Sequence, residues 1–271
     1  MVLPVGDVNP THRPPVLTWL LLLANAAVFL LVQVPLDRCE AQAFTYTWGA
    51  VPAELTSGAP LGSGDLERLL GDCAAAVGEV GTVPSTTVWL SLLTAMFVHG
   101  NLGHLVGNLL FLYVFGNNVE DRLGRVRFLA FYLVGGVGAT AAFVALQPTS
   151  TIPLVGASGA IAAILGAYLI VWPRARVFTF VPFPLYLAAL LVPGVRIRSF
   201  WLLFAIVSLP AWLLLGGWIA FQAWAARSEM GDGVAYSAHV AGFVAGIVLL
   251  LLLDRRRQKR GQQPFHPVRA R

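Results

Sequence analysis

The sequence predicts an all-α membrane protein, a bundle of six transmembrane helices with both chain termini in the cytoplasm. Hydrophobic residues make up 57% of the 271 positions and charged residues only 11%, whereas a soluble domain averages about 25% charged residues. The apolar residues come in long blocks, and Lys and Arg cluster after alternate blocks. A chain of this composition cannot cover a soluble surface, so most of it should lie in a lipid bilayer.

The predicted spans are apolar blocks separated by charged or proline-containing segments, and their lengths are close to what a bilayer requires. They cover residues 16–32, 91–115, 128–146, 158–172, a stretch within 200–224, and 235–253. The chain is thereby divided into a cytoplasmic N-terminal segment (1–15), a membrane domain (16–253) with a long outer loop (34–89), and a basic cytoplasmic tail (254–271).

The apolar stretch 177–192 is not counted as a span, because Pro182, Pro184 and Pro193 interrupt or end it and each proline removes a helix hydrogen bond. Counting it as a span would also place Arg196 and Arg198 on the outer side of the membrane, against the preference of basic residues for the cytoplasmic side. We therefore predict a cytoplasm-side or interfacial element here.

Polar side chains within the predicted spans are few, and none is Asp, Glu, Lys or Arg. A single histidine in a span could simply bond a neighbouring helix, but several near one face favour a functional site. Three helices that run in the same direction each place one such group sixteen positions before a charged end, about 24 Å of helix. These groups are His104, Ser158 and His239, counted to Glu120, Arg174 and Arg255.

A serine hydroxyl becomes a good nucleophile only when a base takes its proton, and a neutral imidazole suits that role. Ser158 is expected to begin a helix between the small residues Gly156 and Gly159, where free N–H groups would face an oxyanion. His104 and Asn108, four positions apart, share one helix face and could donate further hydrogen bonds.

Each of these motifs also has a purely structural explanation. A G-x-S-G tetrapeptide alone is a weak signal, because small residues are common where membrane helices cross closely. Asn108 alone could bond another helix. Gly242 and Gly246 are interpreted as structural, since they would let the sixth span approach the fourth, as a Ser–His pair on two helices requires.

These residues together resemble the rhomboid family. The run from His99 through His104 to Asn108 looks like the family's H-x4-H-x3-N signature, and residues 156–159 look like its G-x-S-G. The segment from Ala238-His239 to Gly246 looks like its last helix. The resemblance covers about residues 90–253 and implies a six-helix rhomboid-like bundle that acts as an intramembrane serine endopeptidase.

Carried over by position, the resemblance makes Ser158 the nucleophile and His239 the general base. His104, Asn108 and the Ser158 backbone N–H would form the oxyanion hole, and His99 would be a supporting residue at the outer edge. The chain departs from the family where some members have a tyrosine that packs on the base, because that position is Ala162. No acidic residue lies in the spans to orient His239, so a dyad is expected rather than a triad.

Cys39 and Cys73 both fall in the predicted outer loop, where a disulfide is permitted. We predict one bridge that closes this loop, and the alternative is two unrelated thiols. No metal site or cofactor is expected, because no Cys or His pair has zinc spacing. His99 and His104 are five apart and should lie on different helix faces.

The expected partners are transmembrane protein substrates and the lipid bilayer. Nucleic acid is not expected, because no basic residues interleave with aromatics on one face. A catalytically inactive relative that binds membrane client proteins should lack the serine or the base, and a transporter should show lining charges or repeats. The lack of a eukaryotic targeting segment and the high Ala, Gly and Arg content favour a multi-pass protein of a bacterial plasma membrane.

Overall fold

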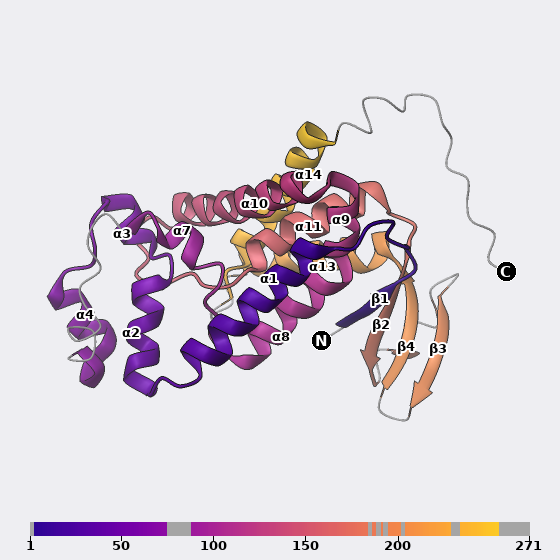
Figure 1. Ribbon diagram of the computed structural model, residues 1–271. Helices are drawn as coiled ribbons and strands as arrows, with labels where there is room; N and C mark the ends of the chain where they lie inside the picture. Colours follow the sequence, from indigo (N-terminus) through magenta and orange to yellow (C-terminus); the bar gives the residue numbers. More distant parts are fainter. Residues whose placement is uncertain are drawn as a thin grey trace.

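The computed structural model describes residues 3–74, 88–183, 186–187, 191, 195–201, 204–228 and 234–254. A helical bundle lies in the middle, with a group of short helices at one end and a β-sheet at the other (Figure 1). The predicted basic tail lies outside the described residues beyond Asp254, as do residues 75–87 of the predicted outer loop.

Helices occupy all six regions in which spans were predicted. They are α1 (Val16–Ala27) continued by η1 (Val28–Gln33), α8 (Leu102–Phe111) continued by η3 (Leu112–Gly116) and α9 (Asn117–Leu123), α10 (Arg125–Leu146), α11 (Ser158–Val171), α13 (Ala211–Arg227) and α14 (Tyr236–Leu253). Among the described residues, three helices are long and apolar enough to cross a membrane, namely Val16–Gln33, Arg125–Leu146 and Tyr236–Leu253. The fold is therefore predominantly helical, with three candidate membrane spans.

The second predicted span starts later than expected. Residues 91–101 are not its first turns but a short helix, α7 (Ser91–Thr94), followed by a turn. The main helix begins at Leu102 because Asn101 caps it, with Asn101 Oδ1 accepting a hydrogen bond from the His104 N–H at 2.8 Å. The fifth span was predicted within 200–224, and its helix begins inside that range at Ala211, where a strand ends, and continues to Arg227.

The prediction of an all-α fold is wrong at one end of the bundle, where four strands form an antiparallel sheet in the order β1-β2-β4-β3. They are β1 (Leu3–Asp7), β2 (Arg176–Pro182), β3 (Arg196–Trp201) and β4 (Phe204–Pro210). Val177, Thr179 and Val181 of β2 are buried while their neighbours are less so, the alternation of a strand with one covered face. The first six residues of the segment rejected as a span, 177–182, thus belong to strand β2, and residues 3–7 of the N-terminal segment pair with this strand.

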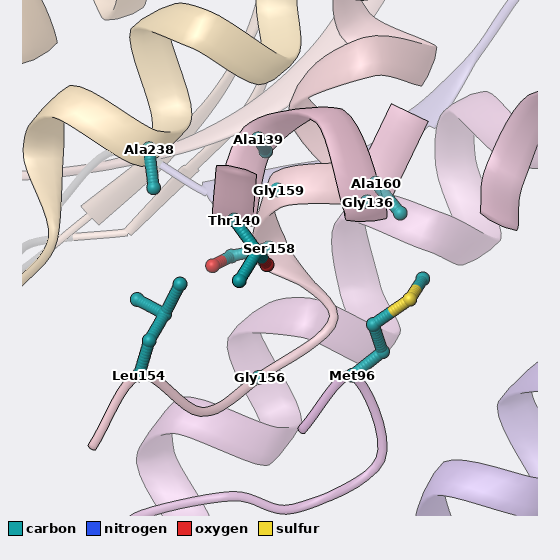
Figure 2. A pocket seen from close by; sticks show the side chains of 10 residues that line it. All are labelled: Met96, Gly136, Ala139, Thr140, Leu154, Gly156, Ser158, Gly159, Ala160 and Ala238. Atoms are coloured by element: carbon teal, nitrogen blue, oxygen red, sulfur yellow. The ribbon is translucent and has the colours of Figure 1, made fainter. Parts of the chain in front are cut away.

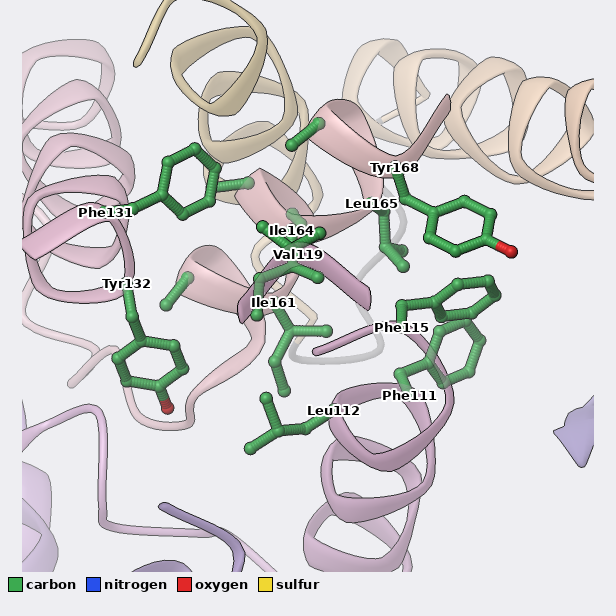
Figure 3. Packing of buried hydrophobic residues seen from close by; sticks show 14 of the residues in the cluster. Phe111, Leu112, Phe115, Val119, Phe131, Tyr132, Ile161, Ile164, Leu165 and Tyr168 are labelled. Atoms are coloured by element: carbon green, nitrogen blue, oxygen red, sulfur yellow. The ribbon is translucent and has the colours of Figure 1, made fainter. Parts of the chain in front are cut away.

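The core of the bundle surrounds α11 (Figure 3). Nine of its fourteen residues are buried, and Ile161, Ile164 and Tyr168 face side chains from α8, η3 and α10. Helix α14 crosses α11 at glycines. A Cβ added at Gly242 would collide with the Gly159 carbonyl, and one at Gly246 would collide with Ala163. The two helices that carry Ser158 and His239 can therefore lie against each other only with glycine at these positions.

The described part of the predicted outer loop forms a helical cap, made of α2 (Arg38–Trp48), α3 (Pro52–Ser57), α4 (Ser63–Leu70) and η2 (Gly71–Cys73). Cys39 and Cys73 form a disulfide in it, beside the buried side chains of Ala43 and Leu70. The cap lies at the end of the bundle opposite the sheet (Figure 1).

Charged and polar groups hold the sheet end of the bundle together. Glu120 accepts hydrogen bonds from the Leu17 N–H, the Thr18 N–H and the Thr18 hydroxyl, at 3.0, 2.7 and 2.8 Å. Arg122 forms an ion pair of 2.7 Å with Asp254, at the end of α14. The first turn of α1 and the last turn of α14 are thereby fixed to α9.

Candidate active site

Ser158 is the first residue of α11 and follows a loop whose Leu154 pairs with Ala50, between α2 and α3 of the cap. Gly156, two positions before it, has a φ of 112°, which a residue with a side chain rarely adopts. The Gly156 N–H donates to the Ala95 carbonyl at 2.8 Å. The turn before Ser158 is therefore fixed to the segment that precedes α8.

His239 lies in the first turn of α14 and faces Ser158. Its Nε2 is 2.8 Å from Ser158 Oγ, within the range that proton transfer between a nucleophile and its base requires. The two residues are 81 positions apart in sequence. The contact therefore depends on the close crossing of α11 and α14.

The other ring nitrogen of His239 has a partner that was not predicted. Nδ1 lies 2.7 Å from Oε1 of Gln222 on α13, and the Gln222 side chain is buried. The rings of Trp218 and Tyr236 have centroids 6.0 and 6.5 Å from that of His239. One sequence signal could have pointed to Gln222: it is the one amide, hydroxyl or charged side chain from Ala211 to Ala226.

His104 and Asn108 lie on the face of α8 that is turned toward Gly156. A Cβ added at Gly156 would stand 2.6 Å from His104 Nε2 and 3.5 Å from Asn108 Nδ2. Asn108 is buried, and among the described residues its Nδ2 has no hydrogen-bond partner. A buried amide donor without a partner costs free energy, so this group is available to a bound oxygen atom beside Ser158.

The expectation that His99 and His104 lie on different faces of one helix is wrong, because α8 begins only at Leu102. His99 precedes the helix, and the ring centroids of the two histidines are 5.2 Å apart with the edge of one facing the other. Gln33, at the end of η1, holds the His99 main chain through two bonds of 3.0 and 2.8 Å. The His99 ring therefore packs against the His104 ring, and the His99 main chain fixes the start of α8 against η1.

A small cavity of about 10 Å³ adjoins Ser158 (Figure 2). It is lined by Met96, Gly136, Ala139, Thr140, Leu154, Gly156, Ser158, Gly159, Ala160 and Ala238. A space of this size is close to the smallest that holds one water molecule. The site therefore has room beside the hydroxyl for a water molecule or a small group.

Fold and site together define a class: a helical membrane protein with a hydrogen-bonded serine and histidine near one end of its bundle. Comparison with known families identifies the family within this class. The family model for the Rhomboid domain matches residues 86–256, more than half of the chain. The chain therefore belongs to the rhomboid family and is an integral membrane protein.

Curated relatives share shorter stretches with it. Rhomboid-like protein 11, chloroplastic, from Arabidopsis thaliana is 42% identical over 73 residues, 27% of this chain and 26% of that protein. Presenilin-associated rhomboid-like protein A, mitochondrial, from Danio rerio is 30% identical over 165 residues, 60% of this chain and 37% of that protein. Rhomboid protease GluP from Bacillus subtilis is 44% identical over 84 residues, 31% of this chain and 16% of that protein. The chain thus spans less than half of the length of each of these relatives.

Proposed function

We propose that the chain is an intramembrane serine endopeptidase that cleaves single-pass transmembrane proteins near the outer membrane face. The observation that carries this is the 2.8 Å contact between Ser158 Oγ and His239 Nε2, which is the geometry of a nucleophile and its base. Two Bacillus subtilis relatives point the same way, because one is named a rhomboid protease and the other a putative one.

In the proposed reaction, His239 Nε2 takes the hydroxyl proton of Ser158 as Oγ attacks the carbonyl carbon of the scissile peptide bond. The negative oxygen that results accepts hydrogen bonds from Asn108, His104 and the Ser158 backbone N–H, at the start of α11. His239 then returns the proton to the leaving amine. A water molecule hydrolyses the acyl-enzyme in the same way, and the cavity beside Ser158 offers it room. No cofactor is required.

The proposed topology has six spans with both termini in the cytoplasm. The sheet end of the bundle carries Arg174, Arg176, Arg196 and Arg198, and basic residues favour the cytoplasmic side. In this proposed topology the cap, its disulfide and Ser158 lie toward the outer face, where a disulfide is favoured. We assign the protein to a bacterial plasma membrane, which has a cytoplasmic face for the basic residues and an outer face that permits the disulfide.

Cleavage of a single-pass substrate, co-reconstituted in liposomes with wild-type protein or Ser158→Ala, tests the proposal. The wild-type protein should cut and the variant should not. Equal cutting by both proteins would assign the activity to another residue. Substrate that co-purifies with the wild-type protein but is never cut would favour an inactive, client-binding relative instead.

A further inference from the structure

Helix α13 presents one polar side chain to the site. Its buried face consists of Ala211, Leu215, Gln222 and Ala225, with Trp218 at the same helical spacing. Gln222 is 6% exposed. An amide on the buried, otherwise apolar face of a membrane helix needs a partner, and its partner here is the imidazole of His239.

We propose that Gln222 is a positioning residue for His239; the proposal rests on the function proposed above. The imidazole lies between two hydrogen bonds, one of 2.7 Å from Nδ1 to Gln222 Oε1 and one of 2.8 Å from Nε2 to Ser158 Oγ. A neutral imidazole has a proton on only one nitrogen. Because the amide oxygen accepts from Nδ1–H, the lone pair of Nε2 is left to face the serine hydroxyl.

The opposite tautomer would fail as a base. With its proton on Nε2, the ring would donate to Ser158 Oγ and could not take the hydroxyl proton, while its Nδ1 lone pair would face the lone pairs of the Gln222 oxygen. With its amide oxygen toward Nδ1, Gln222 therefore favours the reactive form of His239, the task that a carboxylate performs in a Ser-His-Asp triad. An amide performs it without placing a charge in the apolar bundle.

Trp218 supports the same ring from one turn away. It is four positions before Gln222, so both side chains leave the same face of α13. Its ring centroid lies 6.0 Å from that of His239, with an angle of 31° between the ring planes. Gln222 fixes the direction of the Nδ1–H bond and Trp218 restricts tilting of the ring. Together they hold His239 from a helix that contributes no reacting atom.

Substitutions at one position can separate positioning from mere packing. Gln222→Met keeps the length and shape of the side chain but removes the acceptor. Gln222→Glu keeps an acceptor and adds a negative charge beside Nδ1, which favours the protonated ring. Ala223→Met is the matched control, because it adds the same side chain to the same helix at an exposed position.

The experiment measures kcat and KM of the full-length protein in liposomes, from about pH 5 to about pH 9. Gln222→Met should lower kcat by about tenfold to a hundredfold with little change in KM, as the loss of one buried hydrogen bond implies. Gln222→Glu should recover much of this kcat at alkaline pH and move the acid limb of the profile to higher pH. Ala223→Met should behave as the wild type.

The results separate the two proposals. An active wild-type protein with an unchanged kcat and pH profile in Gln222→Met would overturn the positioning role and leave the protease intact. An unshifted acid limb in Gln222→Glu would also overturn it, even if Gln222→Met failed to fold. A wild-type protein that neither cleaves substrate nor reacts with a serine-directed probe would remove the proposed function itself.

Discussion

Ala50 and Leu154 exchange both of their backbone hydrogen bonds, at 2.9 and 2.8 Å. Ala50 lies in the helical cap, whereas Leu154 lies in the loop that leads to Ser158 and lines the cavity beside it. A third bond, from the Ala53 N–H to the Ser150 carbonyl, measures 3.0 Å. The helical cap is therefore fixed directly to the segment that leads to Ser158.

The disulfide should stabilise this cap. Cys39 and Cys73 are 34 positions apart, and closing a loop of that length is worth about 4 kcal/mol by chain entropy. In the double variant Cys39→Ser/Cys73→Ser, amide hydrogens of α2 and α4 should exchange faster, and the Leu154 N–H should follow because its acceptor lies in the cap. Hydrogen exchange read by mass spectrometry measures this. Unchanged protection of α2 would contradict the stabilising role of the bridge.

Glu120 should be essential for the stability of the bundle. It is buried and accepts three hydrogen bonds from the first turn of α1. The positive end of the helix dipole at this N-terminus also stabilises a carboxylate. Glu120→Ala leaves three donors without a partner and should cost on the order of 3 kcal/mol. Thr18→Val removes only the hydroxyl bond and should cost about 1 kcal/mol. Equal thermal unfolding midpoints for the two variants in detergent would refute this ranking.

Gly246 should tolerate no side chain. An added Cβ would meet the backbone of Ala163, so Gly246→Ala must push α14 away from α11 and separate His239 from Ser158. We expect proteolysis to fall by about a hundredfold or more, since small misplacements of reacting groups have effects of that size. Gly217→Ala on α13 is the control, because nothing lies within 4 Å of its added Cβ. Similar rates for the two variants would show that the helix crossing does not limit the reaction.

Asn108 should act on the transition state rather than on substrate binding. Asn108→Leu preserves the approximate size of the side chain and removes the buried donor. The loss of one oxyanion donor typically lowers kcat by about 10²- to 10³-fold, with a small effect on KM. Val106→Ala, at an exposed position of the same helix, should change neither. A rise in KM at constant kcat in Asn108→Leu would instead assign the residue to ground-state binding.

Much of the site was predictable because it depends on the sequence spacing between its residues and the charged ends of their helices. The sixteen-residue spacings that place His104, Ser158 and His239 near one level depend only on the rise of a helix. The structure brings the three side chains to one end of the bundle. The late start of α8 was also readable, because Asn101 is a strong capping residue. The cysteine pair followed from the placement of both residues in one predicted outer loop.

The sheet and Gln222 were not predictable, because both depend on contacts between distant segments. Strand β1 pairs with β2 across 170 to 177 positions, and the local sequence of β2 shows only an apolar run that ends at Pro182. The proline-rich stretch excluded a span but did not indicate the strand partners. Gln222 is an isolated polar residue in its helix, and only the rotation of α13 against α14 turns it toward His239.

The central claim is that Ser158 is a nucleophile activated by His239, and a serine-directed fluorophosphonate tests it most directly. The reagent bonds to an activated serine oxygen and releases fluoride, and mass spectrometry of the digested protein locates the adduct. We predict an adduct on Ser158 in the wild-type protein, and none at this position in Ser158→Ala or His239→Ala. Labelling of wild type at another serine only, or undiminished labelling of Ser158 in His239→Ala, would contradict the account.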